Sequence, residues 1–436
     1  MIKVLLVGNG AREHSIAEAI RDSQQNPSLF SYMKSNNPGI RSLSEKVEIG
    51  SYDDLEKIRY FAKQVRADFC VVGPEAPLDF GVVDALEKIG IPSVGPTQEL
   101  AKLETSKSFT RLLMEKHKVP GLPEFGVFTG MEGVKEFLNS LDSFVVKPDG
   151  LTGGKGVKVH GEHLKGVKDA LKYCEEVLKT HASAIVEERL EGEEFSLQSF
   201  TDGKFVLDPP PAQDHKRAYD GDQGPNTGGM GSYSCSDHLL PFLKKSDMEE
   251  AHRITELVAK AILKETGTLY KGVMYGGFII TKDGLKLLEY NARLGDPEAM
   301  NVLPILNSDF IEICYGIVNG NLSKVRADFG KRSTVCKYVV PKGYPENPVK
   351  GERIEVSPDP KARVYYASVD QRPDGLYMSG SRAIAFVGIS EDFSEAERLA
   401  EQAITNVKGN VFHRKDIGTK ELIQRRIDHM KRIRGG

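Results

Sequence analysis

The sequence has few features of a secreted protein, a protein with a cysteine-bound metal site or a membrane protein. Its cysteines are few and scattered, and they lack the spacing of a metal site or a redox pair. They are Cys70, Cys174, Cys235, Cys314 and Cys336. We therefore expect reduced thiols and a cytoplasmic location. No apolar run approaches the roughly 20 residues that span a bilayer, and the first residues resemble a buried strand rather than a signal peptide.

An excess of charge of either sign is also absent. The 436 residues include 59 Lys and Arg and 62 Asp and Glu, so the formal net charge is only −3. This balance argues against a basic nucleic-acid-binding surface and against an acidic solvating tail. The sequence contains no internal repeat, low-complexity tract or disordered linker. We expect small-molecule partners, without nucleic acid or membrane, and a monomer or weak homodimer.

Alternation of apolar runs with helical segments predicts an α/β and α+β multidomain protein. The first domain reads as a doubly wound parallel sheet, and the last as a mixed α+β unit. The expected elements are strands at 1–7, 68–72, 92–94 and 333–340, and helices near 12–22, 80–89, 106–120 and from 420 onward. The expected domains are residues 1–103, 104–323 and 324–436.

Residues 285–298 carry the most informative pattern. The alternating run 285–288 predicts a strand that presents Glu289 and Asn291 on one face and leads Arg293 into a Gly-Asp-Pro turn. Carboxylate and amide oxygens suit Mg²⁺ that carries nucleotide phosphates, and a guanidinium suits an anion that accepts a phosphoryl group. The alternative is an ordinary strand end with a solvated salt bridge.

A loop rich in glycine and lysine lies at 145–157, between two short apolar strands. Its glycines allow backbone N–H groups to approach phosphates, while Lys147 and Lys155 neutralise their charge. The spacing differs from a Walker A loop, since no Gly-Lys-Ser/Thr opens a helix. We therefore predict a polyphosphate-binding loop, with a flexible hairpin tip as the alternative.

The amino-terminal turn at 8–14 reads Gly-Asn-Gly-Ala-Arg-Glu-His and resembles half of a dinucleotide fingerprint. Glu13 replaces the third glycine of that fingerprint, so we do not expect a nicotinamide cofactor. Backbone donors at the helix start, together with Arg12, would suit a single phosphate. Glu13 and His14 are expected on the helix surface. Glu75 follows another strand and could bind ribose hydroxyls, although a rigid Pro-containing turn explains it equally well.

Two further polar segments could shape a pocket. In 185–196 the backbone of 187–190 could pair with an adenine edge while a following carboxylate takes the ribose, or the segment could be a solvated acidic hairpin. In 213–231 Asp214 could hold an ammonium group and the 228–231 backbone could surround an anion. A mobile surface loop is the alternative for the second segment.

Taken together, these motifs resemble those of the phosphoribosylamine–glycine ligases, a family of the ATP-grasp superfamily. They lie in order at 8–14, 72–78, 213–217, 224–231, 293–298 and 414–418. The resemblance implies an ATP-grasp core with a mobile lid at about 123–194. It also implies that ATP converts glycine to glycyl phosphate, which 5-phosphoribosylamine attacks to give glycinamide ribonucleotide, ADP and phosphate in de novo purine biosynthesis.

The same resemblance implies roles for individual residues. Glu289 and Asn291 would hold Mg²⁺ or Mn²⁺, Arg293 the glycine carboxylate or acyl phosphate, and Asp214 the glycine ammonium. ATP, the co-substrate, would contact Lys107, Lys147, Lys155, Glu187, Glu188, Leu190 and Glu194. The substrates would contact Gly8, Asn9, Gly10, Arg12, Glu13, Glu75, Pro77, Gly229 and Met230.

Some segments depart from the family pattern. Residues 35–40 match it only in part, so no substrate contact is carried over to them, and Gly277 cannot add a metal ligand. Segments 364–367 and 380–382 also differ, although Arg382 keeps its place. A related ATP-grasp ligase with another carboxylate or amine, and a non-enzymatic ATP-binding sensor, remain alternatives.

Overall fold

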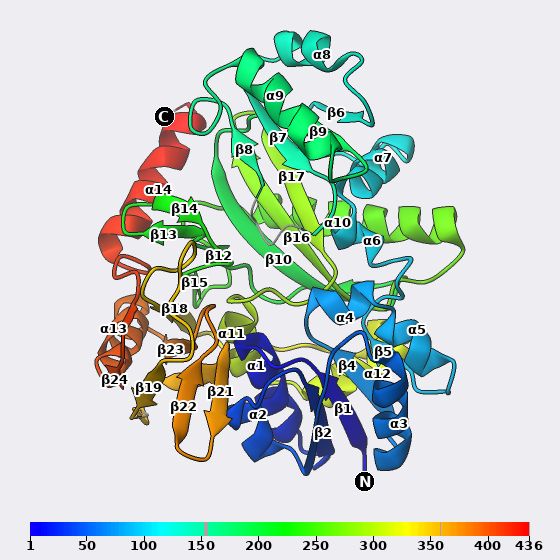
Figure 1. The fold of residues 1–436 in the computed structure, drawn as a ribbon, viewed down its shortest axis with the longest axis vertical. Helices are drawn as coiled ribbons and strands as arrows, with labels where there is room; N and C mark the ends of the chain where they lie inside the picture. Colours follow the sequence, from blue (N-terminus) through cyan, green and yellow to red (C-terminus); the bar gives the residue numbers. More distant parts are fainter. Residues whose placement is uncertain (152–155, 358, 436) are drawn as a thin grey trace.

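The structure, a computed structural model, describes residues 1–151, 156–357 and 359–435. Its first part is a five-stranded parallel sheet in the order β3-β2-β1-β4-β5, which confirms the predicted doubly wound unit (Figure 1). The strands are β1 (Lys3–Val7), β2 (Ser28–Met33), β3 (Lys46–Ile49), β4 (Phe69–Val72) and β5 (Ser93–Val94). The helices are α1 (Ala11–Arg21), α2 (Pro38–Leu43), α3 (Leu55–Val65), α4 (Glu75–Asp79) and α5 (Val82–Glu87).

Two antiparallel sheets of four strands each follow, in the orders β6-β9-β7-β8 and β11-β10-β16-β17. The strands are β6 (Phe125–Phe128), β7 (Phe144–Pro148), β8 (Lys158–Val159), β9 (Ala184–Glu188), β10 (Glu193–Thr201), β11 (Val206–Leu207), β16 (Gly272–Thr281) and β17 (Gly284–Asn291). The helices are α6 (Lys102–Thr105), α7 (Lys107–Lys116), α8 (Val134–Ser140), α9 (Val167–Leu178), α10 (Lys245–Thr266), α11 (Ala299–Val302), α12 (Phe310–Asn319) and the short η1 (Leu303–Ile305) and η2 (Leu322–Lys324). The β6–β9 sheet with α8 and α9 has its own hydrophobic core and lies opposite the amino-terminal domain in Figure 1.

The last part combines a sheet in the order β12-β15-β18-β23-β20, with β25 on β18, and a second sheet in the order β21-β22-β19-β24. Its strands are β18 (Ser333–Pro341), β19 (Arg353–Val356), β20 (Arg363–Tyr366), β21 (Val369–Arg372), β22 (Gly375–Met378), β23 (Ile384–Ser390), β24 (Val407–Lys408) and β25 (Val411–Phe412). Its helices are α13 (Phe393–Ile404) and α14 (Lys420–Ile433). Two earlier strands, β12 (Gln213–Asp214) and β15 (Gly231–Ser234), complete the first sheet, so this polar segment is anchored on the carboxy-terminal strands.

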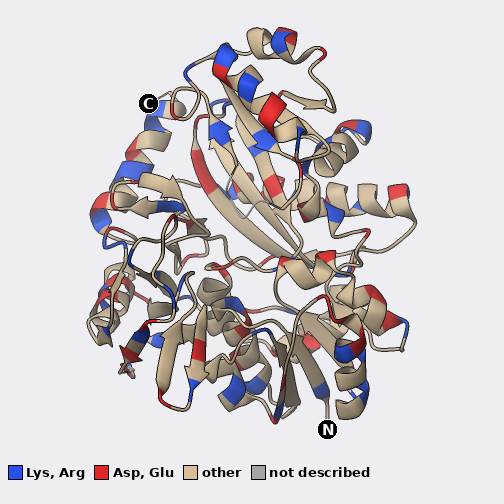
Figure 2. Ribbon diagram, in the orientation of Figure 1, with Lys and Arg blue, Asp and Glu red and all other residues tan. Residues whose placement is uncertain are grey.

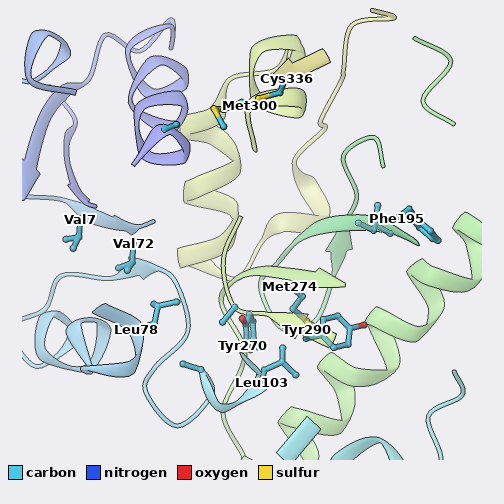
Figure 3. Packing of buried hydrophobic residues seen from close by; sticks show 14 of the residues in the cluster. Val7, Val72, Leu78, Leu103, Phe195, Tyr270, Met274, Tyr290, Met300 and Cys336 are labelled. Atoms are coloured by element: carbon cyan, nitrogen blue, oxygen red, sulfur yellow. The ribbon is translucent and has the colours of Figure 1, made fainter. Parts of the chain in front are cut away.

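One hydrophobic core joins all three parts of the chain. It includes Val7 and Val72 of the parallel sheet, Phe195 and Tyr290 of the central sheet, and Cys336 of β18 (Figure 3). Burial of such side chains stabilises each by about 1.5–3 kcal/mol relative to exposure. The continuous core therefore holds the strand ends that carry the polar motifs in fixed positions.

The two ends of α7 follow from local chemistry. Ser106 caps α7 by accepting a hydrogen bond from Phe109 N at 3.2 Å, close to the predicted start of this helix. The helix was expected to reach residue 120, but it ends at Lys116, and Lys118 adopts a left-handed φ of 54°. The polar segment 213–231, for which a mobile surface loop was the alternative, contains three short strands and the start of a fourth. Two of these, β13 (Arg217–Tyr219) and β14 (Gln223–Asn226), form a hairpin.

Charged residues of both signs are interspersed over every part of the ribbon (Figure 2). This distribution agrees with the balanced composition. No helix in the described ranges is both long enough and apolar enough to cross a membrane.

Candidate active site

The turn between β1 and α1 is built around the side chain of Glu13. Its carboxylate accepts hydrogen bonds from Gly10 N, at 2.6 Å, and from Arg12 Nε. A Cβ atom at Gly8 or Gly73 would lie 2.3 Å from Glu13 Cγ, so both positions need glycine. The expectation of a surface-exposed Glu13 was wrong, since the side chain fills the space that the two glycines leave and is 1% exposed. Its carboxylate orders the turn.

His14 is also buried, and the expectation of a surface position was wrong for it as well. The imidazole stacks on Tyr366, with ring centroids 5.8 Å apart, and meets Tyr365 edge-on at 5.4 Å. Both tyrosines belong to β20 of the carboxy-terminal domain. A partner so distant in sequence could not be inferred from the local pattern around His14.

The amino-terminal turn meets the motif at 293–298 through Glu75, the first residue of α4. Glu75 Oε2 lies 3.9 Å from Arg12 Nη2 and 3.4 Å from Arg293 Nε. Burial alone would raise the pKa of Glu75, but the two guanidinium groups outweigh burial and lower the pKa to about 2. Pro77, predicted beside Glu75, is buried within α4. Residues from two predicted sites therefore share one ion-pair cluster.

Arg293 has a second carboxylate partner that no sequence motif identified. Its Nη2 lies 3.0 Å from Glu104 Oε1 and donates to Asn291 Oδ1 at 3.3 Å. Glu104 also accepts from Ala292 N at 2.7 Å, which fixes the end of β17. Burial raises the pKa of Glu104, while Arg293 opposes this shift. The charges of Glu104 and Glu75 outweigh burial and raise the pKa of Arg293, so its guanidinium remains charged.

Two cations converge on Glu187 at the end of β9. Arg111 Nε lies 2.7 Å from Glu187 Oε1, and Lys147 Nζ lies 2.6 Å from Oε2. Burial alone would raise the pKa of Glu187, but Arg111 and Lys147 outweigh it and lower the pKa to about 2. The Glu187 side chain, 4% exposed, therefore holds Lys147 in position. Neighbouring Glu188 is half-buried and accepts a hydrogen bond from Glu124 N at 2.8 Å.

A second predicted phosphate-binding lysine, Lys107, lies on the adjoining helix. Lys107 begins α7 and donates from Nζ to Gly150 O at 2.7 Å. Asp149 accepts from Ser108 N at 3.2 Å, which joins the same helix start to the loop. Lys155 lies outside the described residues.

Glu289 and Asn291, both half-buried, lie at the end of β17 as predicted. Burial alone would raise the pKa of Glu289, but Lys216, Lys147 and Lys107 outweigh it and lower the pKa. Glu289 thus stays ionised among cations, and no donor in the described part of the chain hydrogen-bonds to its carboxylate.

Lys216 lies within a recognised motif, yet the sequence assigned it no role. It pairs with exposed Glu194, at 3.1 Å from Oε2. Glu194 is the second residue of β10, and predicted Leu190 is half-buried in the segment before that strand. The charges of Glu194 and Glu289 raise the pKa of Lys216. Lys216 therefore stays protonated between the predicted ATP and metal residues.

Asp214 presents an unused buried acceptor. Its Oδ1 has no hydrogen-bond partner among the described residues. Burial and the nearby carboxylate of Glu298 raise its pKa well above the usual range. Glu298 itself accepts from Tyr275 OH at 2.6 Å. A buried, unpaired carboxylate beside another carboxylate is a site that a cation would stabilise.

Gly229 and Met230 line the same region through their backbones. A Cβ at Gly229, whose φ is +105°, would lie 2.5 Å from Asp214 Oδ1. Gly229 N donates to Thr227 Oγ1 at 3.0 Å, and Met230 N donates to His215 O at 2.8 Å. These two N–H groups are thus paired within the protein in this structure.

Arg382 of the carboxy-terminal domain braces the Gly-Asp-Pro turn. Its Nη1 donates to Gly228 O at 2.6 Å and to Asp296 O at 2.7 Å, while Nη2 lies 3.2 Å from the Asp296 carboxylate. Its guanidinium also lies over the Tyr338 ring, 4.5 Å from the centroid. The carboxy-terminal domain therefore fixes both backbone segments beside Asp214.

Comparison with known proteins gives matches along most of the chain. Models of Phosphoribosylglycinamide synthetase match in order: the N domain over 2–104, the ATP-grasp (A) domain over 105–299 and the C domain over 334–420. The chain is 48% identical to a phosphoribosylamine–glycine ligase of Methanosarcina barkeri, covering 100% of both chains. It is 49% identical to one of Pyrococcus furiosus, covering 100% of this chain and 98% of that one.

Solved structures agree with these matches. The phosphoribosylamine–glycine ligase of Thermotoga maritima has a TM-score of 0.81 and 26% identity, covering 95% of this chain and 100% of that one. The biotin carboxylase of Campylobacter jejuni has a TM-score of 0.74 and covers 99% of each chain, but at 15% identity it shows a shared fold alone.

Proposed function

Because this chain belongs to the phosphoribosylamine–glycine ligase family, we propose that it joins glycine to 5-phosphoribosylamine with ATP, giving glycinamide ribonucleotide, ADP and phosphate. The proposal places this reaction in de novo purine biosynthesis. Its main structural support is the ion-pair cluster Arg12–Glu75–Arg293, which joins the amino-terminal turn to the end of β17. A ligase needs such proximity, since its amine acceptor and its activated carboxylate must meet.

The chemistry requires activation of the glycine carboxylate, which is a poor electrophile. Phosphorylation by ATP supplies a leaving group, and the amine of phosphoribosylamine then attacks the acyl carbon and releases phosphate. Arg293 would hold the carboxylate or acyl phosphate, and Asp214 would hold the glycine ammonium. The unpaired Asp214 Oδ1 supports its role, because an ammonium would satisfy this buried acceptor.

The nucleotide would lie between the β6–β9 sheet and β17, with Lys107, Lys147 and Lys155 at its phosphates. Glu188, Leu190 and Glu194 would contact the adenosine. We assign Glu187 to the adenosine site as well. Because its carboxylate is already paired, its side chain would act there by holding Lys147 in position. Lys216, which the sequence left without a role, joins this group.

A divalent cation, Mg²⁺ or Mn²⁺, fits Glu289 and Asn291. Glu289 is ionised and Asn291 offers an amide oxygen, which are hard donors suited to such ions. The described residues contain no group of three or more His, Cys, Asp or Glu that could hold a metal. The remaining ligands would then be water and nucleotide phosphate oxygens, and the ion would neutralise phosphate charge.

The turn Gly8-Asn9-Gly10 with Arg12, Glu13, Glu75 and Pro77 would bind phosphoribosylamine, and Gly229 and Met230 would border the glycine. We also propose domains at 1–103, 104–323 and 324–436, with 123–194 as a lid that closes over the nucleotide and excludes water from the acyl phosphate. The separate core of the β6–β9 sheet supports a lid that moves as one body.

Two properties of the whole protein also remain predictions. We propose a cytoplasmic location, which the five free cysteines support, and a monomer or weak homodimer. Sedimentation of the purified protein at several concentrations would test the second prediction.

The deciding experiment measures ADP release with ATP, Mg²⁺, glycine and phosphoribosylamine generated in situ, with each component omitted in turn. We expect turnover only when glycine and phosphoribosylamine are both present. Turnover with another carboxylate or amine would replace the substrate. ATP binding without turnover would favour a nucleotide sensor, which would need neither Arg293 nor Asp214.

A further inference from the structure

Two of the segments that depart from the family pattern, 35–40 and 364–367, contact each other. The first leads into α2 of the amino-terminal domain, and the second lies on β20 and the turn after it. Asn37 Nδ2 donates to Tyr366 O at 2.7 Å, across the boundary between the two domains. Neither segment was assigned a function from the sequence.

Asn37 uses its full hydrogen-bonding capacity in this contact. Its Oδ1 accepts from Gly39 N at 3.0 Å and Ile40 N at 3.2 Å, and thereby caps α2. Its Nδ2 donates both to Tyr366 O and to Asn9 O, the latter at 2.9 Å. An amide offers two acceptor sites and two donors, and here all four are engaged in a side chain that is 0% exposed.

His14 reinforces the same junction from α1. Its Nδ1 accepts from Tyr366 N at 3.0 Å, so both backbone groups of Tyr366 are bonded to the amino-terminal domain. A Cβ at Gly39 would lie 2.0 Å from the imidazole ring, so glycine is required there for His14 to pack. Burial lowers the pKa of His14 to about 4, which keeps Nδ1 available as an acceptor at neutral pH.

The contact reaches the proposed phosphate site through Asn9, the middle residue of the Gly8–Gly10 turn. Asn9 Nδ2 donates to Ser35 Oγ at 2.9 Å, and its Oδ1 accepts from Tyr52 OH. The turn itself is half exposed at Asn9 and Gly10. Asn37 is therefore the side chain that joins this turn, the start of α2 and the carboxy-terminal strand β20.

We propose that Asn37 is a positioning residue, through which β20 of the carboxy-terminal domain holds the Gly8–Gly10 turn in the conformation that binds the phosphoribosyl group. The inference rests on the proposed function, since that function assigns the turn to phosphoribosylamine. Asn37 does not touch the substrate. It fixes the carbonyl of Asn9, and so the plane of the peptide group between Asn9 and Gly10.

Asn36 supplies a matched control. It is hydrogen-bonded to Gln371 of β21: Asn36 Nδ2 donates to Gln371 O at 2.8 Å, and Asn36 O accepts from Gln371 N at 2.9 Å. None of its described contacts reaches Asn9. Substitutions at Asn36 and Asn37 thus weaken the same domain contact, but only those at Asn37 release the turn.

The test compares Asn37→Ser and Asn36→Ser in the full chain. Serine is a good helix cap, so Asn37→Ser keeps the cap of α2 and removes both donor bonds. We expect about tenfold weaker binding of ribose 5-phosphate, the probe, by calorimetry, because a fixed loop binds better than a mobile one. The KM for phosphoribosylamine should rise by a similar factor, while kcat and the KM values for ATP and glycine stay within about twofold.

For Asn36→Ser we expect ribose 5-phosphate affinity within about twofold of the wild type. Unchanged affinity in Asn37→Ser, or equal weakening in both variants, would overturn the inference. If Asn37→Ser fails to fold, Asn37→Thr, which can also cap α2 and lacks the two amide donors, takes its place. Failure of wild-type turnover with glycine and phosphoribosylamine would refute the proposed function, whereas the binding comparison would still decide the role of Asn37.

Discussion

At the scale of single residues, the site is a set of charges whose neighbours fix their protonation states. Arg293 stays charged because Glu104 and Glu75 outweigh burial, and Glu289 stays ionised because lysines surround it. Asp214 is the exception, since burial and Glu298 disfavour its ionised form. An incoming ammonium would reverse that preference, which makes Asp214 the most ligand-dependent charge of the site.

Arg293→Ala should abolish glycine-dependent ADP formation and leave ATP binding largely intact. Removal of one group that stabilises developing charge costs roughly 10²–10³-fold in kcat. The measurements are ADP release with saturating glycine and the Kd for ATP. Arg353→Ala is the control, because Arg353 is exposed and pairs only with exposed Glu355 among its described contacts. Equal loss of ATP affinity in Arg293→Ala would contradict the role assigned to it.

Asp214→Asn should separate function from stability. The amide can accept a hydrogen bond from an ammonium but carries no negative charge to balance it, so we expect the KM for glycine to rise about tenfold or more while the KM for ATP is unchanged. The Tm should not fall, because the substitution removes an ionised group that the folded state disfavours at neutral pH. Asp283→Asn in an exposed turn provides the control. A normal glycine KM would refute the assignment of Asp214.

At the scale of elements, one buried carboxylate links three segments. Glu187 on β9 binds Arg111 of α7 and Lys147 of β7. Arg111 Nη2 further donates to Leu288 O of β17 at 2.7 Å. The sheet that would cover the nucleotide is therefore joined to the strand that carries the metal pair.

Glu187→Gln should weaken that junction. The substitution leaves Arg111 and Lys147 without their counter-charge, and breaking a buried pair typically costs about 3 kcal/mol or more. We expect a lower Tm and an ATP KM raised about tenfold, measured by thermal unfolding and by ADP release. Glu265→Gln removes an exposed partner of Lys116 and should leave both the Tm and the KM for ATP close to the wild-type values. Comparable effects of the two substitutions would show that the Glu187 cluster contributes no more to stability and ATP binding than an exposed ion pair does.

Elements defined by local pattern were predictable, and elements defined by distant partners were not. β1, β17 and β18 follow from apolar or alternating runs, because side-chain burial sets those patterns. The β13–β14 hairpin could not be predicted, since its polar residues are held from the carboxy-terminal end of the chain. Asp222 pairs with Arg414 and with Arg426, and Arg426 belongs to α14.

At the scale of the whole molecule, the site lies where the three parts of the chain meet. Motifs located Arg12, Glu75 and Arg293 separately, and only the fold brings Glu75 within 4 Å of both arginines. Glu104 and Arg111 belong to no recognised motif, because their roles depend on partners far along the chain. The sequence thus identifies residues proposed to bind ligands better than the residues that hold them in place.

The junction between the amino- and carboxy-terminal domains should make stability depend on pH through His14. The pKa of His14 is lowered to about 4 from an ordinary value of 6.5. Above pH 6.5 the folded and unfolded chains are both neutral at this position, so His14 contributes no pH dependence. As pH falls through 6.5, His14 becomes protonated in the unfolded chain but stays neutral in the folded chain. The free energy of unfolding therefore decreases until about pH 4.

His14→Asn tests this dependence, since asparagine can still accept a hydrogen bond from Tyr366 N but does not titrate. The difference in unfolding free energy between pH 7.5 and 5.5 should be smaller in the variant than in the wild type by about 1 kcal/mol. Buried His215, whose pKa is lowered to about 3, gives both proteins the same additional loss. His163→Asn, at an exposed position, should behave as the wild type. Because any cavity left by His14→Asn destabilises equally at both pH values, an identical pH difference in wild type and variant would refute a neutral His14 at this junction.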